Sequence, residues 1–379
     1  METRSPTFTI GVIKETRAGE KRVAIVPEVI KKLAKKGFTF QLESGLGVAA
    51  GFSDQDFASE SVKMGSRDEA LKAPFVFKIQ RPTEEELSKM SAGALLISLL
   101  EPYKNDGFIE KLASQKIDAV ALEMIPRTSR AQSMDVLSSQ ANIAGYRAVL
   151  EAACQYPRFF PMMMTSAGSA KPAKVIILGA GVAGLQAIGA AKRLGASVEA
   201  YDVRPEVKEQ ILSLGAKFIE LDIGESGTGT GGYAKELSEE AKKKQQQLLT
   251  DKLKTADIII TTANVPGRRA PTLVTEEAVK GMRTGSVIID MAAPSGGNCP
   301  LTEAEKIVTK HGVKIVGLTD YPSLVAADSS SFFARNIMNL FVLFLEEKEK
   351  QVSYKINLED DIIAAALVSM GGADRRQKK

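Results

Sequence analysis

Short apolar runs alternate with amphipathic segments along most of the chain. In the first third, candidate helices with apolar residues at helical spacing separate the runs FTIGVI, TFQLES, PFVFKIQ, ALLISLL and DAVALEMI. Runs that are almost continuously apolar are typical of parallel strands buried on both faces. Thr83 and Glu86 have the spacing of a capping box at the start of one candidate helix. The pattern predicts a doubly wound α/β domain.

The same alternation resumes after residue 170. Six further candidate strands are KVIILG, SVEAYD, KFIEL, DIIITT, SVIIDM and VKIVGL. The pattern also predicts a long helix over residues 136–156 and a second over residues 323–350, which returns the chain to the first domain. We therefore expect two doubly wound Rossmann-like domains with a cleft between them, linked by these two long helices. Their predicted bounds are residues 1–135 with 330–379, and residues 136–329.

A glycine motif follows the first strand of the second series. Gly179, Gly181 and Gly184 form G-x-G-x-x-G at the start of a candidate helix. The first glycine suits a tight turn, the second a close approach to a pyrophosphate, and the third close packing of helix on strand. The alternative is a glycine turn that serves helix packing alone. The first domain lacks this motif, so we expect it to hold no dinucleotide of its own.

An acidic residue at the end of the next strand favours NAD(H). Asp202 lies 18 residues after Gly184, where a carboxylate accepts hydrogen bonds from the ribose hydroxyls and repels the 2′-phosphate of NADP(H). Arg204 is close enough in sequence to accept such a phosphate. Asp202 nevertheless occupies the deciding position, and the predicted cofactor is NAD(H).

The single histidine limits the chemistry. A dehydrogenase that oxidises an alcohol or amine removes a proton as the hydride leaves, and histidine is the commonest base for this task. His311 precedes a strand, whereas ligands of open parallel sheets bind beyond the carboxyl ends of strands, so we interpret it as a surface residue. Cys154 and Cys299 are too few for a metal cluster or a disulfide framework. We expect no metal, and two structural thiols in a reducing compartment.

Composition excludes other classes of function. The 379 residues are enough for about two domains, and a net charge of +4 on scattered basic residues does not indicate nucleic-acid binding. The N-terminus lacks the apolar core of a signal peptide, and no apolar stretch reaches the roughly 20 residues of a membrane span. We therefore expect a chain that does not itself cross a membrane.

Residues 225–240, ESGTGTGGYAKELSEE, differ from their surroundings. Glycines and small polar residues cannot form a core, so we expect a surface loop with Gly232 and Tyr233 near its centre. One interpretation is a flexible connector. The other is a lid whose tyrosine closes over bound nucleotide.

Longer motifs resemble those of a known family. The chain is similar to the NAD(H)-binding component, domain I, of proton-translocating nicotinamide nucleotide transhydrogenase, in particular the bacterial form with a separate subunit. The resemblance extends from KRVAIVPEV to Phe333, and the motifs that carry it are PRTSRAQSMDVLSSQANIAGYRAV, FFPMMMTSAG, GAGVAGLQAIGAAKRLGA, GGYAKE, TTANVPGRRAP and PSGGNCP.

The resemblance implies which residues serve the nucleotide. Arg127, Gln132 and Asp135 match residues beside the nicotinamide and are the candidate catalytic residues, with Ser133 and Ser138 next to them. The residues alone would predict only a polar helix start here. GGYAKE resembles the mobile loop of the family. Further candidate cofactor contacts are Val182, Ala183, Val203, Arg204, Gly232, Tyr233, Ala263 and Asn264.

Alanine dehydrogenase shares this family's fold, and the sequence departs from it at key positions. Arg22 and Lys78 match residues that bind its substrate carboxylate, and they keep either a structural or a residual binding role. Ser98 and Leu99, however, stand in place of the catalytic histidine, and Pro294 in place of the catalytic aspartate.

Transhydrogenation needs no base, since hydride transfer from NADH to NADP⁺ releases no proton at the reacting carbons. The resemblance implies a Si/Re-specific NAD(P)⁺ transhydrogenase in which NADP(H) binds a partner subunit and membrane-spanning proton-channel subunits translocate protons. It also implies a homodimer in the cytoplasm, peripheral to the inner membrane. The alternatives are an alanine-type amino acid dehydrogenase and an NAD(H)-binding regulatory module.

Overall fold

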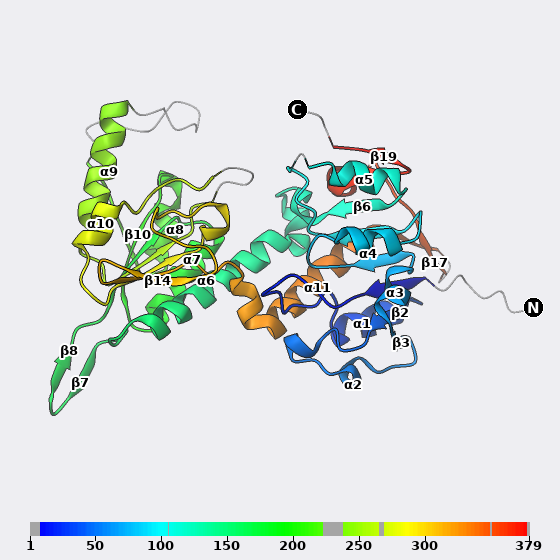
Figure 1. Ribbon diagram of the computed structural model, residues 1–379, viewed down its shortest axis with the longest axis horizontal. Helices are drawn as coiled ribbons and strands as arrows, with labels where there is room; N and C mark the ends of the chain where they lie inside the picture. The colour runs from blue at the N-terminus through cyan, green and yellow to red at the C-terminus, as the bar shows by residue number, and fades with distance from the viewer. Residues whose placement is uncertain (1–7, 105, 223–237, 265–268, 349–350, 377–379) are drawn as a thin grey trace, which may run out of the picture. The chain divides into compact units, whose positions relative to one another are not determined.

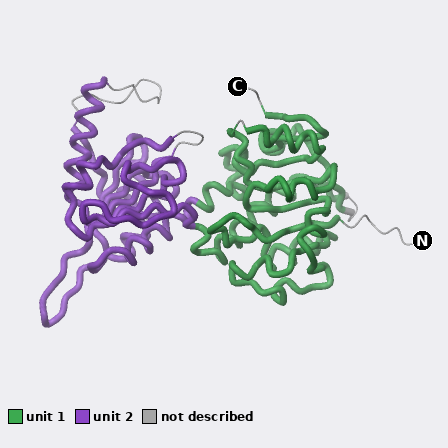
Figure 2. Tube along the Cα trace, viewed as in Figure 1, with its two compact units in different colours: residues 1–140, 322–379 green, residues 141–321 purple. Residues whose placement is uncertain are grey.

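The chain divides into two compact units. The computed structural model describes residues 8–104, 106–222, 238–264, 269–348 and 351–376. Unit 1 comprises residues 1–140 and 322–379, and unit 2 comprises residues 141–321 (Figure 2). The sequence pattern placed these divisions at 135/136 and 329/330. Unit 1 is therefore built from two separate stretches of chain, whereas unit 2 is continuous.

Unit 1 contains a sheet of eight strands in the order β3-β2-β1-β4-β5-β6-β18-β19 (Figure 1). Its first six strands are parallel and follow the doubly wound order 3-2-1-4-5-6, which confirms the predicted fold class. The strands are β1 (Thr9–Val12), β2 (Thr39–Glu43), β3 (Val62–Gly65), β4 (Phe75–Phe77), β5 (Leu95–Ser98), β6 (Asp118–Ala121), β18 (Leu367–Met370) and β19 (Ala373–Asp374).

Helices and apolar side chains cover both faces of this sheet. Successive residues of a strand belong to different hydrophobic clusters: Phe75 and Phe77 pack into one, and Val76 into the other. The predicted capping box is present, because Thr83 Oγ1 accepts from the Glu86 amide at 3.2 Å. The helices are α1 (Pro27–Ala34), α2 (Asp54–Phe57), α3 (Arg67–Leu71), α4 (Glu84–Lys89), α5 (Phe108–Ser114), α11 (Ala326–Val342) and α12 (Asp361–Ala366).

The predicted helix over residues 323–350 is wrong beyond Val342. The chain there forms an antiparallel hairpin of β16 (Leu345–Lys348) and β17 (Gln351–Tyr354). Phe344 is buried and stacks on the Tyr354 ring at 6.3 Å, and its carbonyl accepts a hydrogen bond from the Lys355 amide. These aromatic and backbone contacts outweigh the helical spacing of the apolar residues.

Unit 2 repeats the strand order of unit 1. Its sheet has the order β11-β10-β9-β12-β13-β15-β14 and contains all six predicted strands, which are parallel. The edge strand β14, antiparallel to β15, escaped prediction. The strands are β9 (Lys174–Leu178), β10 (Ser197–Tyr201), β11 (Lys217–Phe218), β12 (Ile258–Thr261), β13 (Val287–Asp290), β14 (Ile307–Lys310) and β15 (Val313–Val316).

The helices of unit 2 pack on both faces of this sheet, since Val175 and Ile176 of β9 belong to different hydrophobic clusters. The long helix α6, predicted over residues 136–156, contains the first division between the units. The helices are α6 (Val136–Gln155), α7 (Val182–Arg193), α8 (Lys208–Ser213), α9 (Glu239–Leu253) and α10 (Glu276–Gly281). No helix in the described part of the chain is both long and apolar enough to span a bilayer.

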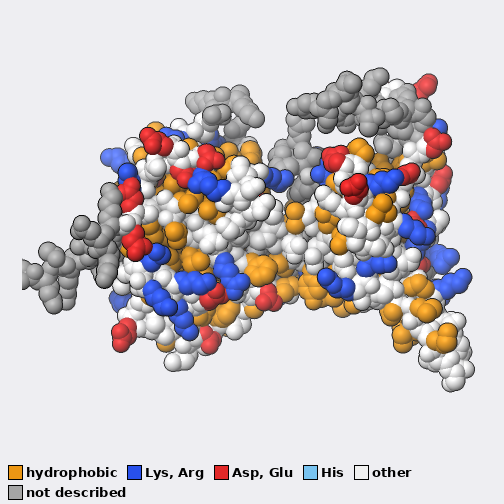
Figure 3. Space-filling model, turned by 180° about the vertical axis from the view of Figure 1, so that it is seen from behind, with side chains coloured by type: hydrophobic (Ala, Val, Ile, Leu, Met, Phe, Trp, Pro, Cys, Tyr) orange, Lys and Arg blue, Asp and Glu red, His pale blue; other side chains and the backbone are white. Residues whose placement is uncertain are grey.

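A two-stranded hairpin, β7 (Met163–Thr165) and β8 (Gly168–Ala170), precedes the sheet of unit 2. Met164 is 75% exposed, and hydrophobic side chains gather along this hairpin at the lower right of Figure 3.

Candidate functional site

The glycine turn between β9 and α7 has the geometry expected of each glycine. Gly179 has a positive φ of 95°, which side chains other than glycine rarely adopt. A Cβ on Gly184 would lie 1.9 Å from the Gly179 carbonyl oxygen, so only glycine allows this helix to approach the turn. A Cβ on Gly181, the N-cap of α7, would meet no heavy atom of the described residues within 4 Å. The open side of the turn is therefore at the helix N-terminus, where an anion is favoured.

This turn lies where the direction of sheet winding reverses. β9 pairs with β10 on one side and with β12 on the other, and ligands of doubly wound sheets bind beyond the carboxyl ends of such strands. Thr262, just after β12, donates its hydroxyl to the carbonyl oxygens of Leu178 and Gly179 at 3.2 and 3.0 Å. The threonine thereby fixes the first residue of the glycine turn.

Asp202 follows β10 and lies beside the turn. Its Oδ2 accepts a hydrogen bond from the Ala180 amide at 2.7 Å. Its Oδ1 accepts from the backbone amide and the Nε of Arg204 at 2.9 and 3.0 Å, and Arg204 Nη2 donates to Oδ2 at 3.0 Å. Burial opposes ionisation, but these donors outweigh it and lower the pKa of Asp202 below its usual value. The carboxylate is therefore charged at neutral pH.

Asp290, at the end of β13, organises the opposite side of the crevice. Its fully buried carboxylate accepts from the hydroxyls of Thr261 and Thr302 and from the amides of Ala292, Asn298 and Cys299 at 2.6–3.1 Å. All five donors are neutral. The carboxylate thus holds the end of β12 and residues 292–302 in one arrangement.

Asn298 extends this arrangement to the candidate residues after β12. Its Nδ2 donates to the carbonyl oxygens of Ala263 and Pro271 at 2.9 and 2.7 Å, so it holds both ends of residues 263–271. Ala263 is half-buried and Asn264 is exposed. Sequence reasoning missed Thr262, Asp290 and Asn298, although the acid that ends SVIID and the GGN turn after it were visible signals.

The remaining candidates of unit 2 lie around the turn. Val182 and Val203 are 42% and 69% exposed, and Ala183 is half-buried at the start of α7. Gly232 and Tyr233 lie outside the described residues, so neither interpretation of their loop is tested.

The candidates of unit 1 form a short 3-10 turn, Ser129–Met134, before α6. Asp135 caps the helix, since its carboxylate accepts from the Ser138 amide and hydroxyl at 2.8 and 2.6 Å. The Ser133 carbonyl accepts from Asn336 and Asn339 of α11 at 2.8 and 3.1 Å. The helix start that the residues alone predict is therefore present. Arg127, Gln132 and Ser133 are exposed on this supported turn.

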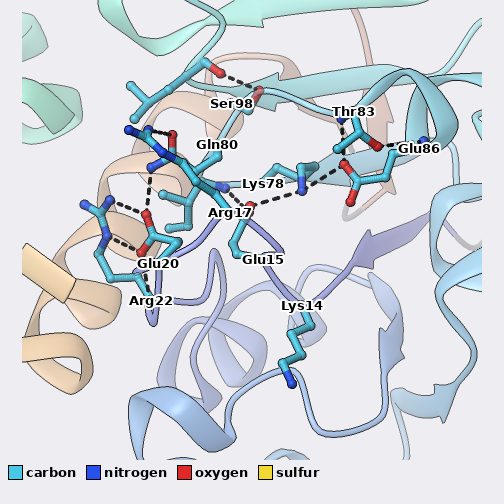
Figure 4. A network of polar contacts seen from close by, with 12 residues as sticks. Lys14, Glu15, Arg17, Glu20, Arg22, Lys78, Gln80, Thr83, Glu86 and Ser98 are labelled. Carbon is cyan, nitrogen blue, oxygen red and sulfur yellow. Dashed lines mark hydrogen bonds and ion pairs between the residues drawn. The ribbon is translucent and has the colours of Figure 1, made fainter. Parts of the chain in front are cut away.

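Arg22 and Lys78 belong to a buried network at the carboxyl ends of β1 and β4 (Figure 4). Arg22 donates to both carboxylate oxygens of Glu20, at 2.8 Å from Nε and 2.6 Å from Nη2. Lys78 lies 3.1 Å from Glu15 and 3.4 Å from Glu86. Both cations are thus engaged by carboxylates of the chain itself.

The acids of this network differ in their pKa. Burial raises the pKa of Glu15 above its usual value despite the nearby Lys78. Burial also opposes ionisation of Glu20, but hydrogen bonds and charge from Arg22 outweigh it and hold the pKa of Glu20 at about 2. A pocket of about 370 Å³ opens beside the network, lined by charged residues of both signs that include Glu15, Arg17, Lys78, Arg81 and Lys104.

The departures from alanine dehydrogenase lie at the ends of strands. Ser98 is fully buried and its hydroxyl donates to the Leu99 carbonyl. Pro294 lies in a short 3-10 turn after β13. His311 occupies the turn between β14 and β15, at the opposite end of the sheet from the glycine turn, and its ring lies 3.1 Å from Glu276. The surface position predicted for His311 is confirmed.

Comparisons with known proteins agree over almost the whole chain. Residues 11–144 and 148–376 match the N-terminal and C-terminal domain models of the alanine dehydrogenase/PNT family. An NAD(P) transhydrogenase alpha subunit of Rhodospirillum rubrum is 49% identical over 96% of this chain and 97% of its own length. Alanine dehydrogenase 1 of Staphylococcus aureus is 26% identical over 92% and 90%.

Solved structures give the same result. The crystal structure of transhydrogenase from Sinorhizobium meliloti superposes with a TM-score of 0.87 at 40% identity, and covers 97% of this chain and 99% of that one.

Proposed function

The chain belongs to the alanine dehydrogenase/PNT family, and from that premise we propose that it is the NAD(H)-binding component of an NAD(P) transhydrogenase. The observation that carries the proposal is the crevice of unit 2. There the open glycine turn at the start of α7 supplies backbone donors for a pyrophosphate, and the ionised Asp202 supplies acceptors for the adenosine ribose.

Selectivity for NAD(H) follows from the charge of Asp202. An ionised carboxylate at this place repels the 2′-phosphate of NADP(H), and each 1.4 kcal/mol of that repulsion changes affinity by about tenfold. The proposed contacts of the rest of the nucleotide are with Val182, Ala183, Val203, Ala263 and Asn264.

Hydride transfer is the proposed reaction. One C–H bond breaks at the nicotinamide of NADH and one forms at the nicotinamide of NADP⁺, with no proton released, so the chain need only hold the ring in place and exclude water. We propose that Arg127, Gln132 and Asp135 hold the nicotinamide end. Asp135 is tied to the start of α6 through Ser138 and supplies a fixed point for this turn.

The proposal requires partners. The chain carries one glycine fingerprint, so NADP(H) binds on a second subunit, and membrane subunits couple the reaction to proton translocation. We also propose that the chain works as a homodimer in the cytoplasm, attached to the inner membrane through its partners, with the Si/Re stereochemistry of its relatives' reaction.

An alanine-type dehydrogenase is the second candidate, and the geometry of unit 1 argues against it. Arg22 already binds the carboxylate of Glu20, and Lys78 lies between Glu15 and Glu86, so neither cation is left for a substrate carboxylate without rearrangement. The single histidine lies at the wrong end of the unit 2 sheet. A regulatory module that binds NADH without hydride chemistry is a third candidate.

Two measurements test the proposal. Calorimetry on the purified chain should show NADH binding at least about tenfold tighter than NADPH binding. Mixed with an NADP(H)-binding transhydrogenase subunit, the chain should transfer hydride from NADH to an NADP⁺ analogue in a stopped-flow experiment. Equal affinities would contradict the NAD(H) assignment. Steady reduction of NAD⁺ by alanine alone would favour the dehydrogenase, and binding without transfer the regulatory module.

A further inference from the structure

We propose that Arg204 is a built-in competitor for the adenosine ribose, because its guanidinium occupies the carboxylate positions of Asp202 that the ribose hydroxyls need. NADH must displace this side chain in order to bind. The inference rests on the proposed function and adds to it a residue that sets both affinity and selectivity.

The donors on Asp202 carry the first step. An ionised carboxylate has about four acceptor positions, and four donors already face this one. Two are backbone amides, of Ala180 at 2.7 Å and of Arg204 at 2.9 Å. The other two are Nε and Nη2 of the Arg204 side chain, each at 3.0 Å. Two ribose hydroxyls therefore find acceptors only if the guanidinium leaves.

The two kinds of donor differ in their ability to move. The Ala180 amide belongs to the glycine turn and the Arg204 amide to the chain that follows β10, so both hold the carboxylate in position when the side chain departs. The Arg204 side chain is 50% exposed, and the charge of nearby Glu206 also acts on it. The positions vacated by Nε and Nη2 equal in number the two hydroxyl donors of the ribose.

Charge extends the argument to NADP(H). While Arg204 is paired with Asp202, it offsets the negative charge that rejects a 2′-phosphate, and once displaced it remains close enough to pair with that phosphate. The guanidinium therefore weakens NADH binding and moderates the rejection of NADPH. Removing it should affect the two nucleotides in opposite directions.

The test is Arg204→Met, which keeps most of the aliphatic length and removes every donor. Half-exposed ion pairs contribute up to about 1 kcal/mol, so NADH should bind the variant about two- to fivefold more tightly, while NADPH binds more weakly. Arg204→Gln serves as a second variant with the same expected directions. Arg193→Met is the matched control, since Arg193 is exposed at the end of α7 and its loss changes the net charge equally.

The directions of change decide the outcome. NADH affinity that falls or stays the same in both Arg204 variants overturns the inference, because the guanidinium would then assist binding or stand apart from it. Equal changes for the Arg193 and Arg204 variants overturn it as well, since net charge alone would explain them. If the wild-type chain binds NADH with the expected selectivity, such a failure concerns Arg204 alone. If the wild-type chain does not bind NADH, the proposed function itself fails.

Discussion

Gly145 of α6 packs directly against the backbone of Ala183 at the start of α7. A Cβ on Gly145 would lie 2.1 Å from the Ala183 carbonyl oxygen and 3.0 Å from its Cα. Because α7 follows the glycine turn, a shift of its first turn also moves the backbone that faces the crevice. The glycine of the SSQANIAGYRAV segment thus sets the position of the nucleotide helix from outside the site.

Replacing Gly145 with alanine should destabilise the protein. The added methyl group meets backbone rather than a flexible side chain, and overpacking of this kind costs about 1–3 kcal/mol. Gly189→Ala in α7 is the matched control, because its Cβ would meet only Arg193 Nη1 at 4.0 Å. There the helix propensity of alanine should stabilise by up to about 1 kcal/mol. Urea unfolding measures both, and equal effects of the two changes would refute this account of Gly145.

Removing the Asp290 carboxylate should destabilise unit 2 strongly. In Asp290→Ala, five neutral donors lose their acceptor inside the protein, and each unsatisfied buried group costs about 1–3 kcal/mol. We expect a loss of at least about 4 kcal/mol. Asp251→Ala, on the exposed face of α9, should change stability by less than about 0.5 kcal/mol. A small effect of Asp290→Ala in urea unfolding would show that residues 292–302 hold their arrangement without the carboxylate.

Shortening Gln132 to asparagine should slow hydride transfer more than it weakens binding. If Gln132 positions the nicotinamide, the loss of one methylene lets the ring drift by about 1 Å, which costs on the order of 100-fold in rate. The glycine turn and Asp202 still hold the other half of NADH. Single-turnover transfer and equilibrium binding separate the two effects. A collapse of affinity with an unchanged rate per bound complex would make Gln132 an ordinary binding residue.

The stability contributed by Glu20 should depend on pH. Its pKa is about 2 in the folded protein, against about 4.3 in an unfolded chain. A lowered pKa stabilises the folded state above the unfolded pKa, and this contribution is lost as pH falls from about 4.3 towards 2. The difference in unfolding free energy between wild type and Glu20→Gln should therefore narrow as pH is lowered from 6 to 3. A constant difference across that range would contradict the ion pair with Arg22.

Local sequence patterns predicted most of the fold. The strands around β9 are continuous apolar runs, and the three glycines and Asp202 obey distance rules that a single stretch of sequence contains. The same applies to Thr83 and Glu86, whose capping box lies within one turn of helix. Such features depend on neighbours in sequence and are therefore visible without a structure.

Features that depend on distant partners were not predictable in this way. Strand β18 is antiparallel to β6, although about 250 residues separate the two, and nothing near Leu367 indicates this pairing. The helical spacing after Val342 is overridden by the stacking of Phe344 on Tyr354. Asn298 likewise acquires its role only because Ala263 and Pro271 lie beside it in the folded unit.

The discontinuous make-up of unit 1 has a consequence for the order of biosynthesis. Its strand β6 waits for β18, which leaves the ribosome only after the whole of unit 2 has been made. Domains generally fold as units during translation, and unit 2 is complete once residue 321 has emerged. The nascent chain therefore exposes one edge of its first sheet while the nucleotide-binding unit folds. The unit that begins synthesis first is the one completed last.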